Sequence, residues 1–520
     1  MKKQVIKSTV VVAGSTMLSR ILGFFRDAVM ANYFGTGASF DGFIVAFRIP
    51  NLLRRFVAEG TLTICFVPVY TEYLEIHGKD AALKLAQKTL SFLIVILTVL
   101  TLSGIVFSPR LVALFGYGFT DQTLISSTIS LNRIMFPYIF MVSLVAFCMG
   151  YLNSHRSFFA PAVSPVLLNL GMIFGALVLR NYFENGLWGL AFGVLIGGTL
   201  QVVLQLPFMI RNGFRMRISF DYKHPGIRKI GFMILPAMMS GAVSQLNLLI
   251  NTVLASMLPG GSVSYLYYAD RLTEIVVGVF VVSIAGVALP ELSRYASRKD
   301  MVNLRSAFAR AVTSSLFFSV PASVALMVSG HQIIEVLFMR GEFDMVSVSN
   351  TYKALFFASA GLFTLTFYKL LVPVFYSLQD TRTPFITAAV ALLINAVTGY
   401  TLMQTSLAHA GLALSSVVSI MVQVVLLLVL LRKKMGRIGF RGIIKPAIKL
   451  LFASAVMGVW LWFAQGRLVW GEDIVTTRKI AQLVFLIASG GILYITICYI
   501  IRVDELKTVL SIIRRKMKRV

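Results

Sequence analysis

Charged side chains interrupt three apolar stretches of this sequence, at about residues 8–33, 40–72 and 262–293. A charge at membrane depth costs roughly a few kcal/mol, so such residues normally face a water-filled cavity and mark a functional site. The basic residues in these stretches are all arginines, whose planar guanidinium groups match phosphate oxygens in a bidentate way. The pattern predicts a phosphate-bearing substrate. The charged residues that suggest such a site are Arg20, Arg26, Asp27, Asp41, Arg48, Arg54, Arg55, Glu59, Asp270, Arg271 and Glu274.

The spacing of these charges predicts that several share a helix face. Arg20 and Asp27 are seven residues apart, close to two helical turns. Arg271 and Glu274 stand at positions i and i+3, which are neighbours on a helix surface, and Asp270 lies one turn before Glu274. The charges of the first and third stretches are therefore expected to converge.

In the second stretch, Arg48, Arg55 and Glu59 also fall on one face, although Pro50 is expected to kink the helix. An alternative interpretation is that the charges form internal salt bridges, or that some lie near the membrane surface and extend their charged ends to water. For Asp41, Arg54, Arg55 and Glu59 this alternative stays open.

The sequence contains no recognisable catalytic or metal-binding motif. Its five histidines are scattered, with no HExxH, P-loop or GxSxG pattern. The cysteines Cys65, Cys148 and Cys498 lie in apolar stretches and have no metal-ligand spacing. The helices expected at 228–257, 384–404 and 409–431 contain no Asp or Glu, which argues against a carboxylate-based cation site there. No enzyme activity, cofactor or resident metal is expected.

The composition indicates an all-α protein that crosses a membrane many times. Of the 520 residues, 57% are hydrophobic and only 13% are charged, whereas a soluble domain carries about a quarter charged residues. Stretches of about 20 apolar residues recur along the whole chain. We expect about fourteen transmembrane helices, at 8–33, 40–72, 84–107, 127–152, 158–180, 186–210, 228–257, 262–293, 306–328, 348–377, 384–404, 409–431, 446–465 and 480–501.

The basic residues favour one orientation of these helices. Most of the 48 Lys and Arg residues fall in the loops that are cytoplasmic if the N-terminus is cytoplasmic, and such a bias sets membrane topology. Both termini are therefore predicted to be cytoplasmic. These loops explain the net charge of +27 better than nucleic-acid binding does. The basic tail at 506–520 is expected to lie near anionic lipid headgroups.

An internal repeat is visible in the sequence. Gly189-Leu190-Ala191 recurs as Gly411-Leu412-Ala413, and Gln201-Val202-Val203-Leu204 recurs as Gln423-Val424-Val425-Leu426, with the same offset in both cases. Two lobes of six helices each would be parallel repeats, as in transporters that bind substrate between their halves. The predicted parts are 1–222 for the first lobe, 223–440 for the second, 441–505 for two extra helices and 506–520 for the tail.

Three motifs closely resemble those of the MurJ (MviN) family. They are Ser19-Arg20-Ile21-Leu22-Gly23-Phe24-Phe25-Arg26-Asp27, then Phe47-Arg48-Ile49-Pro50-Asn51-Leu52-Leu53-Arg54-Arg55 with Ala58-Glu59-Gly60, and Tyr268-Ala269-Asp270-Arg271-Leu272. The family belongs to the multidrug/oligosaccharidyl-lipid/polysaccharide exporter superfamily and consists of bacterial inner-membrane flippases for lipid II, a polyprenyl-pyrophosphate-linked peptidoglycan precursor.

The resemblance implies a central cavity between two six-helix lobes, and a hydrophobic groove for the lipid tail formed by the two extra helices. It implies that Arg20, Arg26, Asp27, Asp41, Arg54 and Arg271 line the cavity, with Glu59 and Asp270 in support. Arg48 stands where the family often has lysine and should keep the positive charge.

The function expected from this resemblance is translocation of lipid II to the outer leaflet by alternating access, for cell-wall synthesis. The expected partners are lipid II, membrane lipids and, less directly, cell-wall synthesis proteins, with no nucleic acid. A flippase for another polyprenyl-pyrophosphate-linked glycan is the main alternative. A multidrug antiporter would favour a carboxylate-dominated cavity, and a non-transporting scaffold would not need convergent buried arginines.

Overall fold

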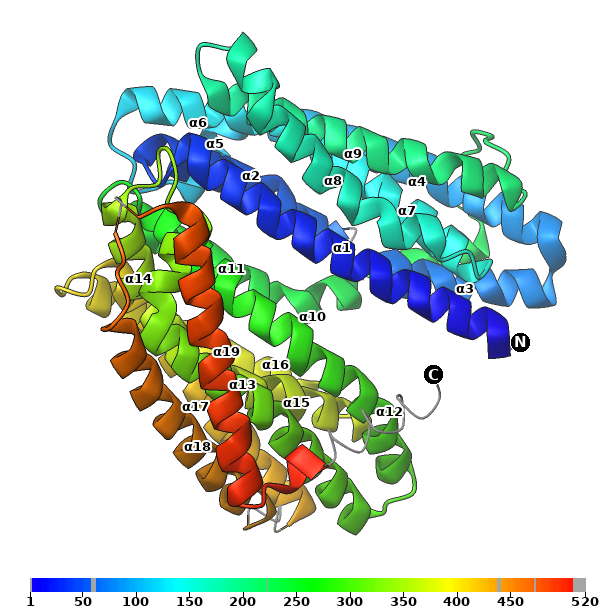
Figure 1. Cartoon of the computed structure of the whole chain (residues 1–520). Helices are drawn as coiled ribbons and strands as arrows, with labels where there is room; N and C mark the ends of the chain where they lie inside the picture. The colour runs from blue at the N-terminus through cyan, green and yellow to red at the C-terminus, as the bar shows by residue number, and fades with distance from the viewer. Residues whose placement is uncertain (1, 58–61, 222, 437–440, 472–473, 508–520) are drawn as a thin grey trace. The chain divides into compact units, whose positions relative to one another are not determined.

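The computed structural model describes residues 2–57, 62–221, 223–436, 441–471 and 474–507, and within them the chain forms helices and turns without a strand. The chain divides into two compact units (Figure 1). Unit 1 comprises Met1–Val263 together with Arg340–Phe343, and unit 2 comprises Ser264–Met339 together with Asp344–Val520.

Unit 1 contains the first ten α-helices and one short 3-10 helix. They are α1 (Lys2–Phe34), α2 (Ala38–Val57), α3 (Thr63–Ile76), α4 (Gly78–Val106), α5 (Ser108–Phe115), α6 (Gln122–Met135), α7 (Tyr138–Ser154), α8 (Phe159–Leu177), η2 (Leu179–Tyr182), α9 (Gly186–Arg211) and α10 (Pro225–Ser256).

Unit 2 contains the remaining α-helices and one π-helical turn. They are α11 (Ser262–Val276), η3 (Val277–Val281), α12 (Val282–Ser297), α13 (Met301–Phe338), α14 (Met345–Ala360), α15 (Leu362–Ser377), α16 (Arg382–Met403), α17 (His409–Met435), α18 (Arg441–Gln465) and α19 (Thr476–Ile500).

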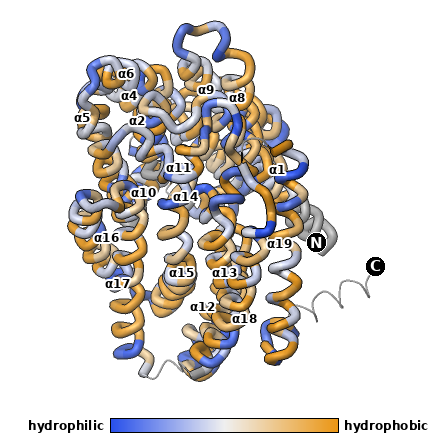
Figure 2. The backbone as a smooth tube through the Cα atoms, turned by 60° about the vertical axis from the view of Figure 1, so that its left-hand side comes forward, coloured by the Kyte–Doolittle hydropathy of each residue, from blue (hydrophilic) through white to orange (hydrophobic). Residues whose placement is uncertain are grey.

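The helices suit a lipid environment because they satisfy the backbone hydrogen bonds within each segment. Figure 2 shows that hydrophobic residues run along the lengths of helices such as α13 and α17, whereas hydrophilic residues gather at helix ends and loops. Several large apolar side chains on these helices are exposed, among them Val99, Leu393 and Trp462. Such a surface is expected when the surrounding solvent is lipid.

The predicted all-α membrane fold is confirmed, but the number of fourteen spans is not. Ten helices in the described part of the chain are long and apolar enough to cross a membrane, and α14 with α15, bent by 46° at Gly361, would make eleven. Each of the fourteen predicted segments coincides with a helix or a pair of consecutive helices. Some predicted segments are not among these ten or eleven spans. One of them is α1, which contains the charges Arg20, Arg26 and Asp27.

Glycines allow α8 and α9 to pack closely. A Cβ on Gly171 would lie 2.6 Å from the backbone oxygen of Gly193, and one on Gly175 would lie 2.6 Å from that of Gly189. Small residues at such spacing let helix backbones approach each other where lipid provides no hydrophobic driving force. The α8–α9 pair therefore forms a firm support for α1, which packs on α8.

The repeated glycines have equivalent places in the two units. A Cβ on Gly189, in the first turn of α9, would lie 2.4 Å from the backbone nitrogen of Arg180 just after α8. A Cβ on Gly411, in the first turn of α17, would lie 2.7 Å from the carbonyl oxygen of Leu402 at the end of α16. The same close approach at both positions supports the internal repeat.

By its contacts, α10 belongs to unit 1, because it packs on α2 and α3. The compact units therefore divide at Val263, whereas the lobe boundary predicted at residue 222 follows the sequence repeat. The assignment of 223–440 to a second repeat and of 441–505 to two additional helices stays a prediction.

Two ion pairs hold loops against helices. Lys88 Nζ of α4 lies 2.8 Å from a carboxylate oxygen of Asp221, and Lys434 near the end of α17 pairs with Asp380. Burial raises the pKa of Asp380, but hydrogen bonds from Lys434 and Thr383 outweigh it and lower the pKa to about 2. The hydrogen bond from Lys88 likewise lowers the pKa of Asp221. Both carboxylates are therefore ionised at neutral pH.

Candidate functional site

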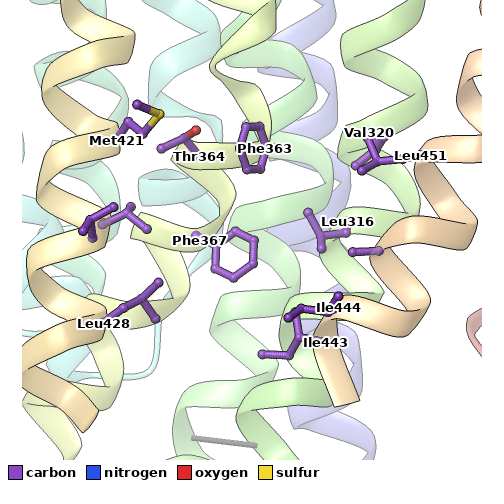
Figure 3. Close-up of a pocket in the computed structure, with 13 residues that line it drawn as sticks. Leu316, Val320, Phe363, Thr364, Phe367, Met421, Leu428, Ile443, Ile444 and Leu451 are labelled. Atoms are coloured by element: carbon purple, nitrogen blue, oxygen red, sulfur yellow. The ribbon is translucent and has the colours of Figure 1, made fainter. Parts of the chain in front are cut away.

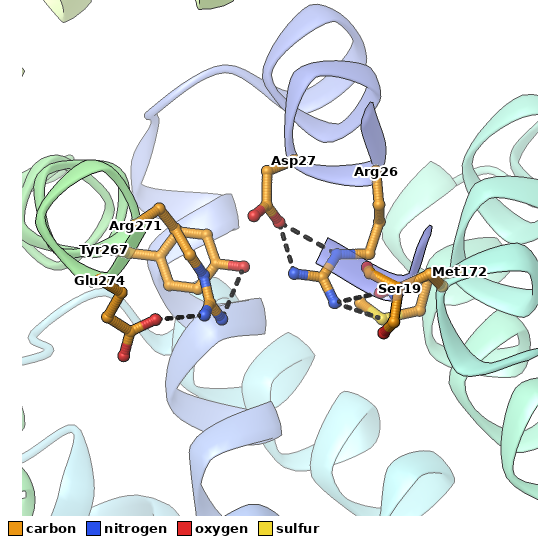
Figure 4. A network of polar contacts seen from close by, with 8 residues as sticks. Ser19, Arg26, Asp27, Met172, Tyr267, Arg271 and Glu274 are labelled. Atoms are coloured by element: carbon orange, nitrogen blue, oxygen red, sulfur yellow. Dashed lines mark hydrogen bonds and ion pairs between the residues drawn. The ribbon is translucent and has the colours of Figure 1, made fainter. Parts of the chain in front are cut away.

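The charged centre of α1 is a buried ion pair. Arg26 and Asp27 expose only 8% and 3% of their surface. The Arg26 guanidinium donates from Nε and Nη2 to one oxygen of Asp27, at 3.0 and 2.6 Å (Figure 4). A buried arginine needs such a partner because an uncompensated charge is costly in a low-dielectric interior.

A second helix fixes the orientation of Arg26. Its Nη1 donates to Oδ1 of Asn169 on α8 at 3.0 Å, and Nδ2 of Asn169 donates to the carbonyl oxygen of Ser19 on α1 at 3.0 Å. The sulfur of Met172 lies 3.7 Å from the same Nη1 (Figure 4). Asn169 therefore links two turns of α1 and aligns the guanidinium. The Cβ position of Gly23 lies 3.6 Å from the Asn169 amide, so Asn169 packs directly against this turn of α1.

The charges of α2 have different environments. Nη1 of Arg48, a half-buried residue, donates to the hydroxyl of Thr252 on α10 at 2.8 Å. Asp41 is 2% exposed and accepts a hydrogen bond from the backbone nitrogen of Gly261 at 2.7 Å. Gly261 has a φ of 97°, so Asp41 stabilises a turn that suits glycine. Arg54 is half-buried.

In unit 2, Arg271 on α11 pairs with Glu274, as the i,i+3 spacing predicted. Its Nη1 donates to a Glu274 oxygen at 2.8 Å, and its guanidinium carbon lies 4.8 Å from the centre of the Tyr267 ring (Figure 4). Nη2 lies 3.4 Å from the Tyr267 hydroxyl. A third of the Arg271 side chain is exposed, so the guanidinium is held in place and still meets solvent.

The other predicted site residues are less organised or are not described. Arg20 is exposed, and in the portion of the chain that the structure covers it has no hydrogen bond or ion pair. Asp270 is exposed on α11. Glu59 and the side chain of Arg55 lie outside the described residues. The structure thus brings together Arg26 with Asp27 and Arg271 with Glu274, and a common cavity for all these charges stays a prediction.

An apolar groove with a volume of about 500 Å³ lies within unit 2 (Figure 3). Its walls come from α13, α15, α17 and α18. Several of its side chains, such as Phe363, Met421 and Leu451, are exposed. The groove is lined by Leu316, Val320, Phe363, Thr364, Phe367, Met421, Val424, Val425, Leu428, Ile443, Ile444, Ala447 and Leu451. One of the two helices predicted to hold a lipid tail, α18, therefore borders a groove with suitable chemistry.

Sequence reasoning missed the uncharged partners of the arginines. Asn169 is a polar residue in an apolar helix, and that isolation was the available signal, whereas Thr252 lies in a segment with several other polar residues. Tyr267 precedes Arg271 by one helical turn, so its contact could have been predicted from spacing. Within the described ranges, no cluster of three or more His, Cys, Asp or Glu residues is placed to hold a metal ion.

A buried ion pair in unit 2 was also missed. Nζ of Lys479 on α19 lies 3.0 Å from Oε1 of Glu335 on α13, and the side chains are only 7% and 1% exposed. The same carboxylate oxygen accepts a hydrogen bond from the backbone nitrogen of Gly471 at 3.0 Å. Both residues lie just outside the predicted apolar segments. The pair joins α13, α19 and the loop before α19.

Comparison with known proteins identifies one family. A family profile described as lipid II flippase MurJ matches residues 30–478. The probable lipid II flippase MurJ of Vibrio cholerae is 35% identical over 516 residues, which cover 97% of this chain and 98% of that protein. The lipid II flippase MurJ of Burkholderia cenocepacia is 33% identical, with 88% of this chain and 90% of that protein covered.

Solved structures agree with this result. A structure of lipid II flippase MurJ in an inward closed conformation matches with a TM-score of 0.80 and 26% identity, over 95% of this chain and 99% of that one. An inward-facing multidrug resistance MATE transporter of the MOP superfamily matches with a TM-score of 0.71 over 82% of this chain and 98% of that one. Its sequence identity of 14% means that this second likeness concerns the fold alone.

Proposed function

The chain belongs to the MurJ family of lipid II flippases, and we propose that it carries lipid II from the cytoplasmic to the outer leaflet of the bacterial inner membrane. It is a transporter with many membrane spans. Alternating access is the mechanism we propose: the two lobes expose the headgroup site first to one side and then to the other, and no covalent bond changes.

The observation that carries this proposal is the buried ion pair of Arg26 and Asp27. The carboxylate compensates the guanidinium, which limits the cost of a buried charge. An arriving pyrophosphate would take over hydrogen bonds from the guanidinium, since Arg binds phosphate oxygens in a bidentate way. Asn169 holds one edge of the guanidinium during this exchange, so the group stays oriented.

Other charges would act on the same headgroup. We propose that Arg20, Arg48, Arg54 and Arg271 bind the pyrophosphate and the neighbouring sugar, with Asp27 and Asp41 placing the arginines. Asp270, Glu274, Glu59 and Arg55 are proposed as supporting charges. The exposure of Arg20 and part of Arg271 is consistent with groups that meet a hydrated ligand.

The lipid tail needs an apolar path beside the headgroup site. We propose that the groove of unit 2 receives part of the polyprenyl chain, because its 500 Å³ are lined almost entirely by apolar side chains. The family resemblance predicts that α18 and α19 guide the lipid tail. We propose that they direct the tail into this groove. Because lipid is as apolar as the groove, close packing and not removal of water would hold the chain there.

Depletion of the protein in its native cell tests this function. An externally added enzyme that cleaves only outward-facing headgroups measures the lipid II pool of the outer leaflet. We expect depletion to abolish the cleavable pool while lipid II accumulates inside. Wild-type protein should restore the pool and Arg271→Ala should not, whereas Arg110→Ala, on α5 away from the site, serves as the matched control.

An unchanged outward pool after depletion would contradict the proposal. If lipid II sidedness does not change but another polyprenyl-linked glycan accumulates inside, the substrate assignment is wrong and the transport class is retained. Retained flipping by Arg271→Ala would contradict only the role given to that arginine.

A further inference from the structure

A polar pocket lies within unit 1, where α1 ends and α2 begins. Its volume is about 410 Å³, within the range of small-molecule sites. It is formed by the end of α1, the start of α2, η2, the start of α9 and the segment Arg340–Phe343. Its lining residues are Tyr33, Phe34, Ser39, Phe40, Arg180, Asn181, Phe183, Glu184, Asn185, Gly186, Leu187 and Glu342.

Arg180 is the cation of this pocket. Its guanidinium carbon lies 3.6 Å from the centre of the Tyr33 ring, a stacked arrangement that fixes the plane of the group. The Nε atom is buried, and among the described residues it has no hydrogen-bond partner, nor does Arg180 form an ion pair there. A stacked guanidinium leaves its N–H edge available for a carboxylate or a phosphate.

The fold holds Arg180 against α9. The missing side chain of Gly189 lets the Arg180 backbone approach, since a Cβ would lie 2.4 Å from the Arg180 nitrogen. The side chain of Asn185 accepts a hydrogen bond from the nitrogen of Leu187 and donates to Ser127. These contacts fix the start of α9, so the pocket wall is rigid before any ligand arrives.

Two carboxylates, Glu184 and Glu342, line the same pocket and are exposed. Neither forms an ion pair with any residue that the structure describes. The backbone nitrogen of Glu342 donates to the carbonyl oxygen of Asn32 at 3.0 Å, and a Cβ on Gly341 would lie 2.2 Å from that oxygen. Glu342 is therefore anchored at the rim by its backbone, and its carboxylate stays available.

From these observations we infer that the pocket binds a zwitterionic amino acid or short peptide, which carries a carboxylate and an ammonium group close together. Arg180 would pair with the carboxylate of the ligand, and Glu184 and Glu342 with its ammonium group. The half-buried rings of Tyr33 and Phe183 would contact the apolar part between the charges. The pocket contains one arginine and two acids that do not pair with one another. Such a pocket complements a ligand that carries both charges better than it complements a simple anion or cation.

The ligand has two possible sources with the same chemistry. All pocket segments lie at helix ends that the basic-residue bias assigns to the outer side. The first source is the peptide of the translocated headgroup, and that assignment rests on the proposed function. The second source is free amino acid or peptide in the outer compartment, which requires no transport at all.

Calorimetry on the purified full-length protein tests the site without a transport assay. The probe is alanyl-alanine with free termini, compared with its C-terminal amide and its N-acetyl derivative. We expect binding of the free dipeptide only, and a loss of at least about tenfold in affinity in Arg180→Gln, because the charge-assisted hydrogen bond to the carboxylate is lost. Glu184→Gln with Glu342→Gln should remove the preference for the free amine.

Arg110→Gln is the matched control, because Arg110 also lies over an aromatic ring, that of Phe107, but outside the pocket. Equal binding of the amide, or unchanged affinity in Arg180→Gln, would overturn the inference. Thermal unfolding shows whether each variant is folded. Glu342→Gln changes an exposed side chain and is therefore expected to leave the packing intact.

Flipping by Arg180→Gln in lipid II vesicles separates the two sources. Reduced flipping would support the headgroup peptide as the ligand, and unchanged flipping with lost dipeptide binding would support a free ligand. If wild-type protein binds the dipeptide but flips no lipid II, the proposed function fails and the peptide site stands.

Discussion

At the residue scale, Arg26 is a buried cation with a compensating partner and a fixed orientation. Asp27 compensates its charge and Asn169 fixes its orientation. Such an ion pair contributes little net stability, because desolvation offsets most of the attraction. Under the proposed function its value would lie in preorganisation, since a guanidinium that is already aligned would not lose rotamer freedom on binding a phosphate.

Arg26→Lys tests whether the forked guanidinium is needed or only the positive charge. Lysine keeps the charge but cannot donate in the same plane to Asp27 and Asn169. We expect flipping of lipid II in vesicles to fall at least about tenfold, with normal membrane insertion, and Arg26→Ala to abolish it. Arg110→Lys is the control. Wild-type flipping by both Arg26 variants would exclude this arginine from the site.

Residue spacing predicted some of these contacts and missed others. The pairing of Arg271 with Glu274 follows from a separation of three residues on one helix, and the structure confirms it. Asn169 lies 143 residues from Arg26, so their contact depends on how α8 packs on α1, which no local pattern specifies. The contact of Asp41 was not predicted either. Its carboxylate accepts a hydrogen bond from the backbone nitrogen of Gly261 and so stabilises a turn.

At the element scale, glycines determine how closely the helices of unit 1 approach one another. Apolar side chains alone do not drive helices together in lipid, so close backbone packing must supply the attraction. The glycines of α8 and α9 provide it. Because α8 also carries Asn169, this packing positions the partner of Arg26.

Gly171→Ala should disturb this support. Its new Cβ would lie 2.6 Å from the Gly193 backbone oxygen, a contact that only a shift of a helix can relieve. We expect a lower thermal unfolding temperature and, because Asn169 moves with α8, slower flipping. Gly231→Ala in α10 is the matched control, since no atom lies within 4 Å of its Cβ position. Equal unfolding temperatures for the two variants would contradict the packing argument.

The pair of Glu335 and Lys479 connects helices at the element scale. Lys479→Met would leave a carboxylate buried without its cation, which costs about 3–5 kcal/mol. The double variant Glu335→Gln with Lys479→Met removes both charges and should recover much of this loss. Denaturant unfolding of both variants in detergent measures the difference. A double variant as unstable as Lys479→Met would indicate that the ion pair itself is not the important contact.

At the scale of the whole molecule, the sequence predicted the class of fold well because apolar length and charge are global signals. The all-α membrane fold follows from composition and the equivalent glycines support the repeat. The number of spans was harder to predict, since charged helices such as α1 and bent pairs such as α14 with α15 depart from simple hydropathy. The membership of α10 in unit 1 depends on tertiary packing, which a sequence repeat does not report.

Membrane orientation provides the last prediction, because the direction of transport depends on it. The cysteines Cys65, Cys148 and Cys498 are buried, so single exposed cysteines can be labelled over a low background. Tyr117 and Ile218 are 70% and 72% exposed and lie in loops predicted to be outer and cytoplasmic, respectively. A membrane-impermeant maleimide added to whole cells should label Tyr117→Cys and not Ile218→Cys, and permeabilisation should expose both. The opposite pattern would place the Arg-rich loops outside and reverse the side from which headgroups enter.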